Sequence, residues 1–144
     1  MVRELKKDSI PSPSRLWYNK WVEKNAKGKV LDVGKSTYWD YGFPTLDINR
    51  DLNPTFIGNI KKTSFPDKTF NLVLCNGMYE FVDDSQKMID EVLRIGEKAI
   101  FGFVGKEYKP YKKEWKFYEG KERLPKHTKK DFDNKYHFII CDSL

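Results

Sequence analysis

Two short apolar runs, each carrying an aspartate near its end, constrain this chain most. The first, 30–33, leads into Asp32-Val33-Gly34, and the second, 45–48, contains Asp47 about fifteen residues after the first aspartate. This spacing suits a strand, a turn that lies close to a ligand, and a second strand whose acid binds a ribose. The pattern therefore predicts two parallel strands with a nucleotide-like cofactor at their carboxyl ends.

The connection between these two runs is unusually short. Only about ten residues separate them, and Pro44 breaks the chain just before the second run. Parallel strands are normally joined by a crossover helix of a dozen residues or more, so we expect that helix to be very short or absent. The segment instead carries Tyr38, Trp39 and Tyr41. We expect these rings to fill the space of the missing helix, with stacking on a base or on adenine as the alternative.

Apolar periodicity predicts two helices. The first runs from about Arg15 to Lys27, with Ser14 as its cap, and the second from Ser85 to Ile95, with Asp83 or Asp84 as its cap. Strands are expected at 29–33, 45–48, 56–59, 70–75, 99–104 and 136–141, the last antiparallel and at the edge. Strands that alternate with helices or loops in this way predict an α/β fold built on a parallel sheet.

Length and composition narrow the class of protein. A chain of 144 residues favours a single domain with one core. No run approaches the ~20 apolar residues of a membrane span, and the N-terminus lacks the apolar stretch of a signal peptide. We therefore expect a cytoplasmic protein without a membrane partner. Cys75 and Cys141 lack the spacing of metal ligands, so we interpret both as reduced and structural, and His127 and His137 as surface or core residues.

The positive charge is concentrated in one part of the chain. The net charge is +6, and the segment 106–137 holds eleven Lys or Arg against six Asp or Glu, a net +5. Aromatic residues alternate with these lysines, namely Tyr108, Tyr111, Trp115, Phe117 and Tyr118. This composition predicts an anionic partner, held as a nucleic acid by charge and stacking or covered as a small molecule by a lid. The alternative is a solvated, lysine-rich surface of a heat-adapted protein.

Four strings of the sequence, in order, carry a family resemblance. They read VLDVGKSTY, TLDIN, NPTFIGNIKKTSFPDKTFNLVLCNGMYEFVDD and MIDEVLRIGEKAIFGF. Over residues 14–104 the chain resembles the class I S-adenosylmethionine-dependent methyltransferases, and most of all the small group with LD[VI]G and PFPDxSFDxV segments. The resemblance implies a Rossmann-like, doubly wound and mostly parallel sheet of about five to six strands, truncated relative to the family. It divides the chain into an arm (1–13) and one domain (14–144), with a cofactor-binding core (14–104) and a basic aromatic tail with an edge strand (105–144).

The resemblance also implies roles for individual residues. The cofactor, S-adenosyl-L-methionine, would contact Asp32, Gly34, Ser36, Asp47, Ile48, Asn59, Ile60 and Asn76. Among these, Gly34 would let the backbone approach the methionine part, Asp47 would bind the ribose hydroxyls, and Asn59 would meet the adenine. The chain departs from the family in its glycine-poor turn, Gly34 to Tyr38, and in having Glu80-Phe81 where Glu-His is usual.

Methyl transfer from a sulfonium requires chiefly that the acceptor be held in line with the methyl group. We accordingly predict catalysis by proximity, with Asn76, Tyr79 and Glu80 as the catalytic residues and the latter two as the only candidate bases. The acceptor is open: a small molecule, a nucleic acid or a protein. Asp32 and Asp47 could also be ordinary strand-end acids, and Asn76 a turn residue.

Two other functions compete with methyl transfer. One is a catalytically inactive methyltransferase-fold module that binds nucleic acid or a protein partner, which the loss of glycines favours. The other is an NAD-dependent oxidoreductase, which ranks low because Ser36 and Trp39 stand where that fingerprint needs glycines. An exposed strand near the C-terminus would in addition allow pairing with a second copy of the chain in a homodimer.

Overall fold

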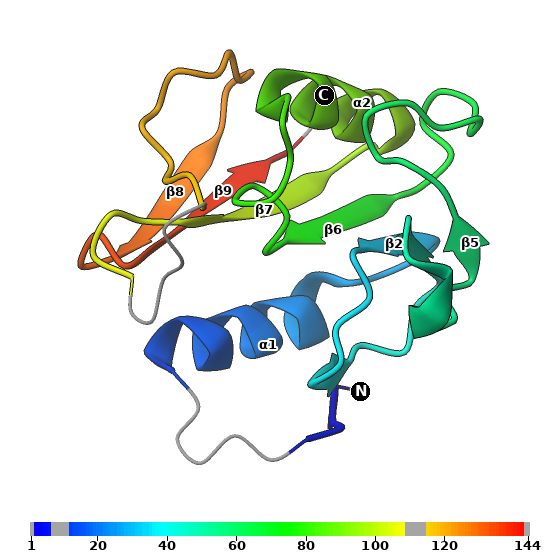
Figure 1. Cartoon of the computed structure of the whole chain (residues 1–144), viewed down its shortest axis with the longest axis horizontal. Helices are drawn as coiled ribbons and strands as arrows, with labels where there is room; N and C mark the ends of the chain where they lie inside the picture. The colour runs from blue at the N-terminus through cyan, green and yellow to red at the C-terminus, as the bar shows by residue number, and fades with distance from the viewer. Residues whose placement is uncertain (1, 7–11, 109–114, 143–144) are drawn as a thin grey trace.

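The computed structural model describes residues 2–6, 12–108 and 115–142 and is built around a seven-stranded sheet (Figure 1). The strand order is β5-β4-β2-β6-β7-β9-β8. The bounds are β2 Val30–Val33, β4 Thr45–Asp47, β5 Phe56–Ile57, β6 Leu72–Asn76, β7 Ala99–Val104, β8 Thr128–Phe132 and β9 Tyr136–Cys141. All neighbours pair in parallel except β9, which runs antiparallel to both β7 and β8. The predicted α/β class with a mostly parallel sheet is confirmed.

The sheet has seven strands rather than the five to six expected, and the difference lies at its C-terminal edge. β8 reads TKKDF, and four of its five residues are exposed. A strand without apolar alternation gives no periodic signal in the sequence. β9 is antiparallel, as predicted, but it is an interior strand because β8 covers it. The edge strand of the tail is therefore β8, and Tyr111 of the basic segment lies outside the described residues.

Two α-helices cover opposite faces of the sheet (Figure 1). α2 spans Ser85–Ile95 as predicted, and the Asp84 carboxylate caps it by accepting the backbone N–H of Lys87 at 3.1 Å. α1 spans Pro13–Asn25 and begins two residues earlier than predicted. Its cap is Ser12 rather than Ser14, because Pro13 is well suited to the first helical position and leaves the preceding serine to accept the N–H of Arg15.

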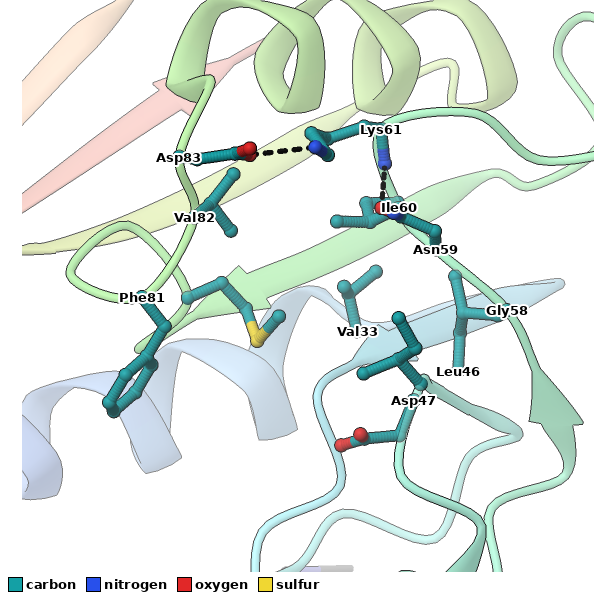
Figure 2. Close-up of a pocket in the computed structure, with 12 residues that line it drawn as sticks. Val33, Leu46, Asp47, Gly58, Asn59, Ile60, Lys61, Phe81, Val82 and Asp83 are labelled. Carbon is teal, nitrogen blue, oxygen red and sulfur yellow. Dashed lines mark hydrogen bonds and ion pairs between the residues drawn. The ribbon is translucent and has the colours of Figure 1, made fainter.

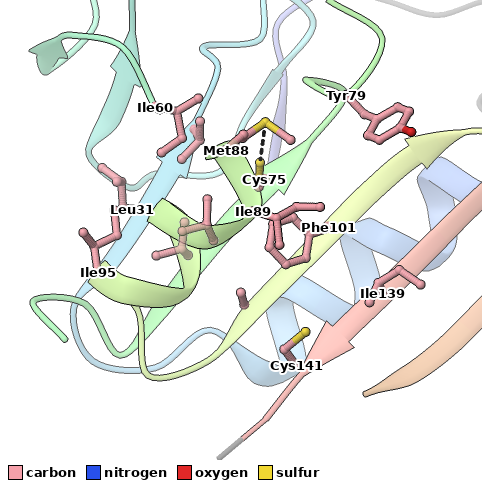
Figure 3. Packing of buried hydrophobic residues seen from close by; sticks show 14 of the residues in the cluster. Leu31, Ile60, Cys75, Tyr79, Met88, Ile89, Ile95, Phe101, Ile139 and Cys141 are labelled. Atoms are coloured by element: carbon pink, nitrogen blue, oxygen red, sulfur yellow. Dashed lines mark hydrogen bonds between the residues drawn. The ribbon is translucent and has the colours of Figure 1, made fainter. Parts of the chain in front are cut away.

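Side chains of the central strands alternate between two apolar clusters. Those that point toward α2 pack with Met88 and Ile89 of that helix in the cluster of Figure 3, and they include Leu31, Cys75, Phe101, Ile139 and Cys141. Those that point toward α1 pack with Tyr18 and Val22 of that helix in a second cluster, and they include Val30, Leu72, Leu74, Ile100 and Phe138. Both cysteines are thus core residues, and burial on both faces explains why these strands read as continuous apolar runs.

The connection between β2 and β4 contains no helix, as expected. It holds β3, Trp39–Asp40, which pairs with β1, Arg3–Glu4, of the N-terminal arm in a separate two-stranded sheet. Trp39 and Tyr41 are buried in the α1-side cluster, whereas Tyr38 is 48% exposed. Two of the three aromatic residues therefore occupy the space of the missing helix. Residues 7–11 of the arm lie outside the described residues.

Within the described part of the chain, neither helix is long and apolar enough to cross a membrane. The short connections include one 3₁₀ turn, Arg50–Leu52, between β4 and β5.

Candidate cofactor-binding site

A cavity of about 260 Å³ opens at the carboxyl ends of the parallel strands (Figure 2). Its lining comes from the ends of β2 and β4, from the segment after β5 and from the segment after β6. These residues are Val33, Leu46, Asp47, Ile48, Gly58, Asn59, Ile60, Lys61, Met78, Phe81, Val82 and Asp83. Ligands of open α/β sheets bind in this crevice, beyond the carboxyl ends of the strands.

Asp47 lies at the end of β4 and holds the neighbouring turn. Its Oδ2 accepts the backbone N–H of Lys35 at 2.9 Å, and its Oδ1 accepts the backbone N–H of Asn49 at 2.9 Å. Each carboxylate oxygen has about two lone-pair sites, so both oxygens can accept one further hydrogen bond. The side chain therefore fixes the turn after β2 and still offers two acceptors to a ligand in the cavity.

Gly34 has a backbone conformation that favours glycine. Its φ is +82°, in the left-handed region, and an added Cβ would lie 2.5 Å from the sulfur of Met78. Met78 in turn lines the cavity. The absence of a side chain at position 34 therefore allows Met78 to lie over the end of β2, which is a structural role in addition to the ligand approach that the sequence suggested.

Polar contacts brace the wall of the cavity opposite Asp47 (Figure 2). The Asn59 side-chain oxygen accepts the backbone N–H of Lys61 at 2.9 Å, which leaves this oxygen one lone pair. The Lys61 ammonium forms an ion pair with Asp83 at 2.7 Å. Hydrogen bonding to Lys61 lowers the pKa of the Asp83 carboxyl. The ion pair ties the segment after β5 to the segment after β6.

Apolar side chains with large exposed surfaces flank the same cavity. Ile48 is 68% exposed and Phe81 is 64% exposed. The Phe81 ring lies edge-on to Trp115, with centroids 5.6 Å apart. Exposed apolar groups beside a cavity are typical of a binding site for a partly apolar ligand.

The structure places four of the eight predicted cofactor contacts in this cavity and four outside its lining, with Gly34 and Asn76 among the latter. Asp47, Ile48, Asn59 and Ile60 all line the cavity. Asp32 and Ser36 instead line a second, polar cavity of about 310 Å³, together with Arg3, Lys35, Trp39, Asp40, Tyr41, Thr45 and Thr55 among others. Asp32 and Val33 are adjacent in β2, so their side chains point to opposite faces of the sheet, and only Val33 faces the first cavity.

Asp32 is a buried carboxyl. Its side chain is 7% exposed, and burial raises its pKa to about 8; the nearby Arg15 charge opposes this rise and the Asp40 charge adds to it. The neighbouring Ser36 shapes the turn, because its hydroxyl oxygen accepts the backbone N–H groups of Tyr38 and Trp39, both at 3.0 Å.

None of the three predicted catalytic residues lines the first cavity. Tyr79 is a core residue: it is 4% exposed, its hydroxyl donates to Glu122, and its ring packs on Phe103. The Asn76 side-chain oxygen accepts the hydroxyl of Tyr136. Glu80 is 8% exposed; its Oε1 is buried without a hydrogen-bond partner among the described residues, and burial raises the pKa of this carboxyl.

Sequence reasoning missed eight lining residues: Val33, Leu46, Gly58, Lys61, Met78, Phe81, Val82 and Asp83. It focused on the residues directly after each strand. The signal that could have found part of the set is the apolar pair Phe81-Val82, which stands between charged residues just before the cap of α2. An apolar pair in an exposed loop indicates a site or an interface.

The sequence profile of the family described as "Methyltransferase domain" matches residues 27–99, half of the chain. A relative with no assigned function, the uncharacterized protein MJ1123 of Methanocaldococcus jannaschii, is 39% identical over 71% of this chain and 67% of its own length. The family match covers β2, β4, β5 and β6, the strands whose ends form the cavity.

Solved structures share the fold. The PH0226 protein of Pyrococcus horikoshii has a TM-score of 0.58, with 21% identity over 94% of each chain. A SAM-dependent methyltransferase of Aquifex aeolicus has a TM-score of 0.57, with 15% identity over 90% of this chain and 92% of that one. For a SAM-dependent methyltransferase of Thermotoga maritima the TM-score is 0.53, with 19% identity over 65% of this chain and 53% of that one. Taken with the family match, this shows that the chain belongs to the class I methyltransferase family.

Proposed function

We propose that this protein transfers a methyl group from S-adenosylmethionine, and that the 260 Å³ cavity holds the adenosine part of this cofactor. One observation carries the proposal: the cavity lies at the carboxyl ends of β2, β4, β5 and β6 and has a carboxylate, Asp47, at its rim. An acid at the end of the second strand is the group that binds ribose hydroxyls in nucleotide-binding α/β folds.

The lining residues fit a nucleoside. Asp47 would accept the ribose hydroxyls, Ile48, Met78 and Phe81 would flank the adenine ring, and Asn59 would meet its polar edge. Pockets for whole drug-sized ligands hold roughly 300–1,000 Å³. A cavity of about 260 Å³ is therefore suited to part of the cofactor, with its methionine end directed toward the Gly34 turn.

When bound, the cofactor supplies an electrophilic methyl group on a sulfonium whose leaving group is a neutral thioether. The chain therefore has no anion to stabilise on the leaving side, and its residues act by binding and orientation. A base is needed only for an acceptor that loses a proton. Of the three predicted catalytic residues, Glu80 has a side-chain oxygen without a partner among the described residues, while Asn76 and Tyr79 each hold a hydrogen bond already.

Calorimetric titration with S-adenosylhomocysteine tests the cofactor assignment. The wild-type chain should bind, and Asp47→Ala should bind at least about tenfold more weakly because the ribose loses a charged acceptor. Asp51→Ala is the matched control, since Asp51 is an exposed aspartate in the neighbouring 3₁₀ turn. Affinity of Asp47→Ala within a few-fold of the wild type would refute the ribose assignment.

A catalytically inactive methyltransferase-fold module is the second candidate function. It is favoured because two of the three residues predicted to be catalytic, Tyr79 and Asn76, are engaged in internal hydrogen bonds. Absence of heat at tens of micromolar S-adenosylhomocysteine would support this module over the enzyme. Since Asp47 also holds two backbone N–H groups, the thermal unfolding of each variant without ligand is measured alongside the titration.

A further inference from the structure

Two adjoining hollows lie on the α1 side of the sheet, away from the cofactor cavity. The first, about 360 Å³, is lined by Trp17, Lys20, Trp21, Lys24 and Asn25 of α1. The second, about 250 Å³, is lined by Lys126, His127, Thr128, Ile140 and Asp142. Lys98 joins them, because its Nζ lies 5.3 Å from the Trp21 ring centroid and 3.1 Å from an Asp142 oxygen. We call these residues, together with Lys130 and Phe132 of β8, the lysine–tryptophan surface.

The aromatic part of this surface is anchored on one side. Trp17 and Trp21 are one helical turn apart, so they lie on the same side of α1. The Trp17 ring packs against Phe138 at 5.0 Å and Phe132 at 6.2 Å between centroids. Both tryptophans are only half-buried. Each ring is therefore held in place by the core and still presents area to solvent, as a platform for stacking requires.

The surface also carries positive charge without compensation. Lys20, Lys24, Lys126 and Lys130 are exposed and form no ion pair with any described residue. The single acid among the described residues that line the two hollows, Asp142, is already paired with Lys98. Lys130 lies on the α1 face of β8, since its Nζ is 5.4 Å from the ring of Phe132, two residues further on.

We propose that the lysine–tryptophan surface binds single-stranded nucleic acid. Lysines along a groove attract phosphates, and half-exposed aromatic rings stack on unpaired bases of any sequence. A duplex would engage only the lysines, because its bases are stacked on each other. A second copy of the chain is disfavoured, because pairing at the β8 edge would bring Lys129 and Lys130 of one copy against the same charges of the other.

The lysine–tryptophan surface runs toward the end of the sheet at which the cofactor cavity lies. It begins near Lys98 and Lys126, at the amino ends of β7 and β8, and leads to Phe132 at the carboxyl end of β8. Phe132 pairs with Tyr136, whose hydroxyl donates to Asn76 at the end of β6. A bound nucleic-acid strand would thus extend toward the carboxyl ends of the β-strands, where the cofactor cavity lies. The binding proposal itself does not depend on methyl transfer.

Fluorescence anisotropy with a labelled single-stranded RNA of about 20 nucleotides, at about 50 and 200 mM salt, tests the proposal. We expect micromolar binding that weakens at the higher salt, similar binding of single-stranded DNA of the same sequence, and at least about fivefold weaker binding of the duplex. No anisotropy change at about 50 μM protein and low salt would overturn the proposal.

A pair of double variants locates the binding surface. Lys24→Glu/Lys130→Glu and the control Lys62→Glu/Lys87→Glu change the net charge equally, from +6 to +2, since each substitution removes two charge units. Lys62 and Lys87 are exposed lysines on a different part of the molecule, beside the segment after β5. We expect at least about a tenfold loss of affinity for the first variant and less than about threefold for the control. Equal losses would show that overall charge alone attracts the RNA.

A third variant tests stacking without changing charge. Trp21→Leu should weaken RNA binding by about fivefold or more while keeping the salt dependence, and RNA should quench tryptophan fluorescence less in this variant than in the wild type. Unchanged affinity and quenching would overturn the aromatic part of the proposal. S-adenosylhomocysteine affinity of Lys24→Glu/Lys130→Glu should equal that of the wild type, so failure of RNA binding and failure of the cofactor assignment are read separately.

Discussion

The carboxylate of Asp47 and the backbone N–H of Lys35 are joined by a 2.9 Å hydrogen bond that links the end of β4 to the turn after β2. Asp47 also lines the cavity that we propose for the cofactor. One side chain therefore both shapes the turn and offers an acceptor to a ligand. Under the proposed function, the stability of the turn and the affinity for the cofactor would both depend on the Asp47 carboxylate.

Replacing Gly34 should destabilise the fold. Gly34→Ala introduces a Cβ at a φ of +82° and within 2.5 Å of the Met78 sulfur, so we expect a loss of about 1–3 kcal/mol in the free energy of unfolding. Urea denaturation measures this loss. Gly34→Ala/Met78→Ala removes the clash and keeps the strained φ. Equal stability of Gly34→Ala and the wild type would contradict both reasons.

Ile48→Ala should weaken cofactor binding without weakening the fold. Ile48 is 68% exposed, so its truncation should change the free energy of unfolding by less than about 0.5 kcal/mol. Its loss from the cavity wall should reduce S-adenosylhomocysteine affinity about threefold to tenfold, the worth of one or two apolar contacts. Leu16→Ala, at an exposed apolar residue of α1, is the control and should leave the calorimetric affinity unchanged.

Tyr79→Phe distinguishes a core residue from a catalytic one. The hydroxyl of Tyr79 donates to Glu122 within the packed core, so its removal should cost about 1 kcal/mol of stability and leave cofactor affinity intact. Once an acceptor is identified, the methyl-transfer rate of the variant should also stay within a few-fold of the wild-type rate. A much larger loss of rate with unchanged stability would return Tyr79 to the catalytic site.

Asp32 should make the fold less stable as the pH rises. Its folded pKa of about 8 lies above the value of about 3.9 in an unfolded chain, so between these values the folded state keeps a proton that the unfolded chain has lost. The free energy of unfolding should therefore fall from pH 5 to pH 8. In Asp32→Asn this decline should be smaller, which denaturation at the two pH values measures. An equal decline in both proteins would contradict the raised pKa.

Glu91 should have the opposite effect to Asp32: its contribution to the free energy of unfolding should rise as the pH rises from low values. Its carboxylate accepts hydrogen bonds from Arg94 and from the backbone and hydroxyl of Thr63, and the Arg94 bond above all lowers its pKa to about 2. Its stabilisation is present above the unfolded value of about 4.3 and is lost as the pH falls toward 2. Glu91→Gln should cost about 1–3 kcal/mol at pH 7, and thermal scans should show this difference shrinking as the pH approaches 2.

The elements that could be predicted from the sequence are those whose signals are local. α2 has both an aspartate cap and a glycine after its last turn, and its bounds matched. β8 could not be predicted, since an exposed edge strand such as TKKDF is defined by its partner β9 and not by its own pattern. The cap of α1 was misassigned because Ser12 and Ser14 both precede the apolar face, and only the position of Pro13 distinguishes them.

The sequence predicted which strand ends form the candidate site, but it did not predict the direction in which each side chain points. Asp47 ends β4 and Asn59 follows β5, and both line one cavity. Asp32 and Val33 are neighbours in β2, and because side chains alternate along a strand they face different cavities. Tyr79 and Phe81 stand two residues apart in one loop, yet one enters the core and the other is exposed. Loops lack a fixed period, so this outcome depends on packing.

The strand order has a consequence for the kinetics of folding. β2 lies inside the sheet between β4 and β6, and Val30 pairs with Leu72, about forty residues along the chain. The middle of the sheet therefore cannot assemble from neighbouring segments alone, because a long loop must close before either apolar cluster is complete. Refolding should accordingly take milliseconds to seconds rather than the microseconds of small helical bundles.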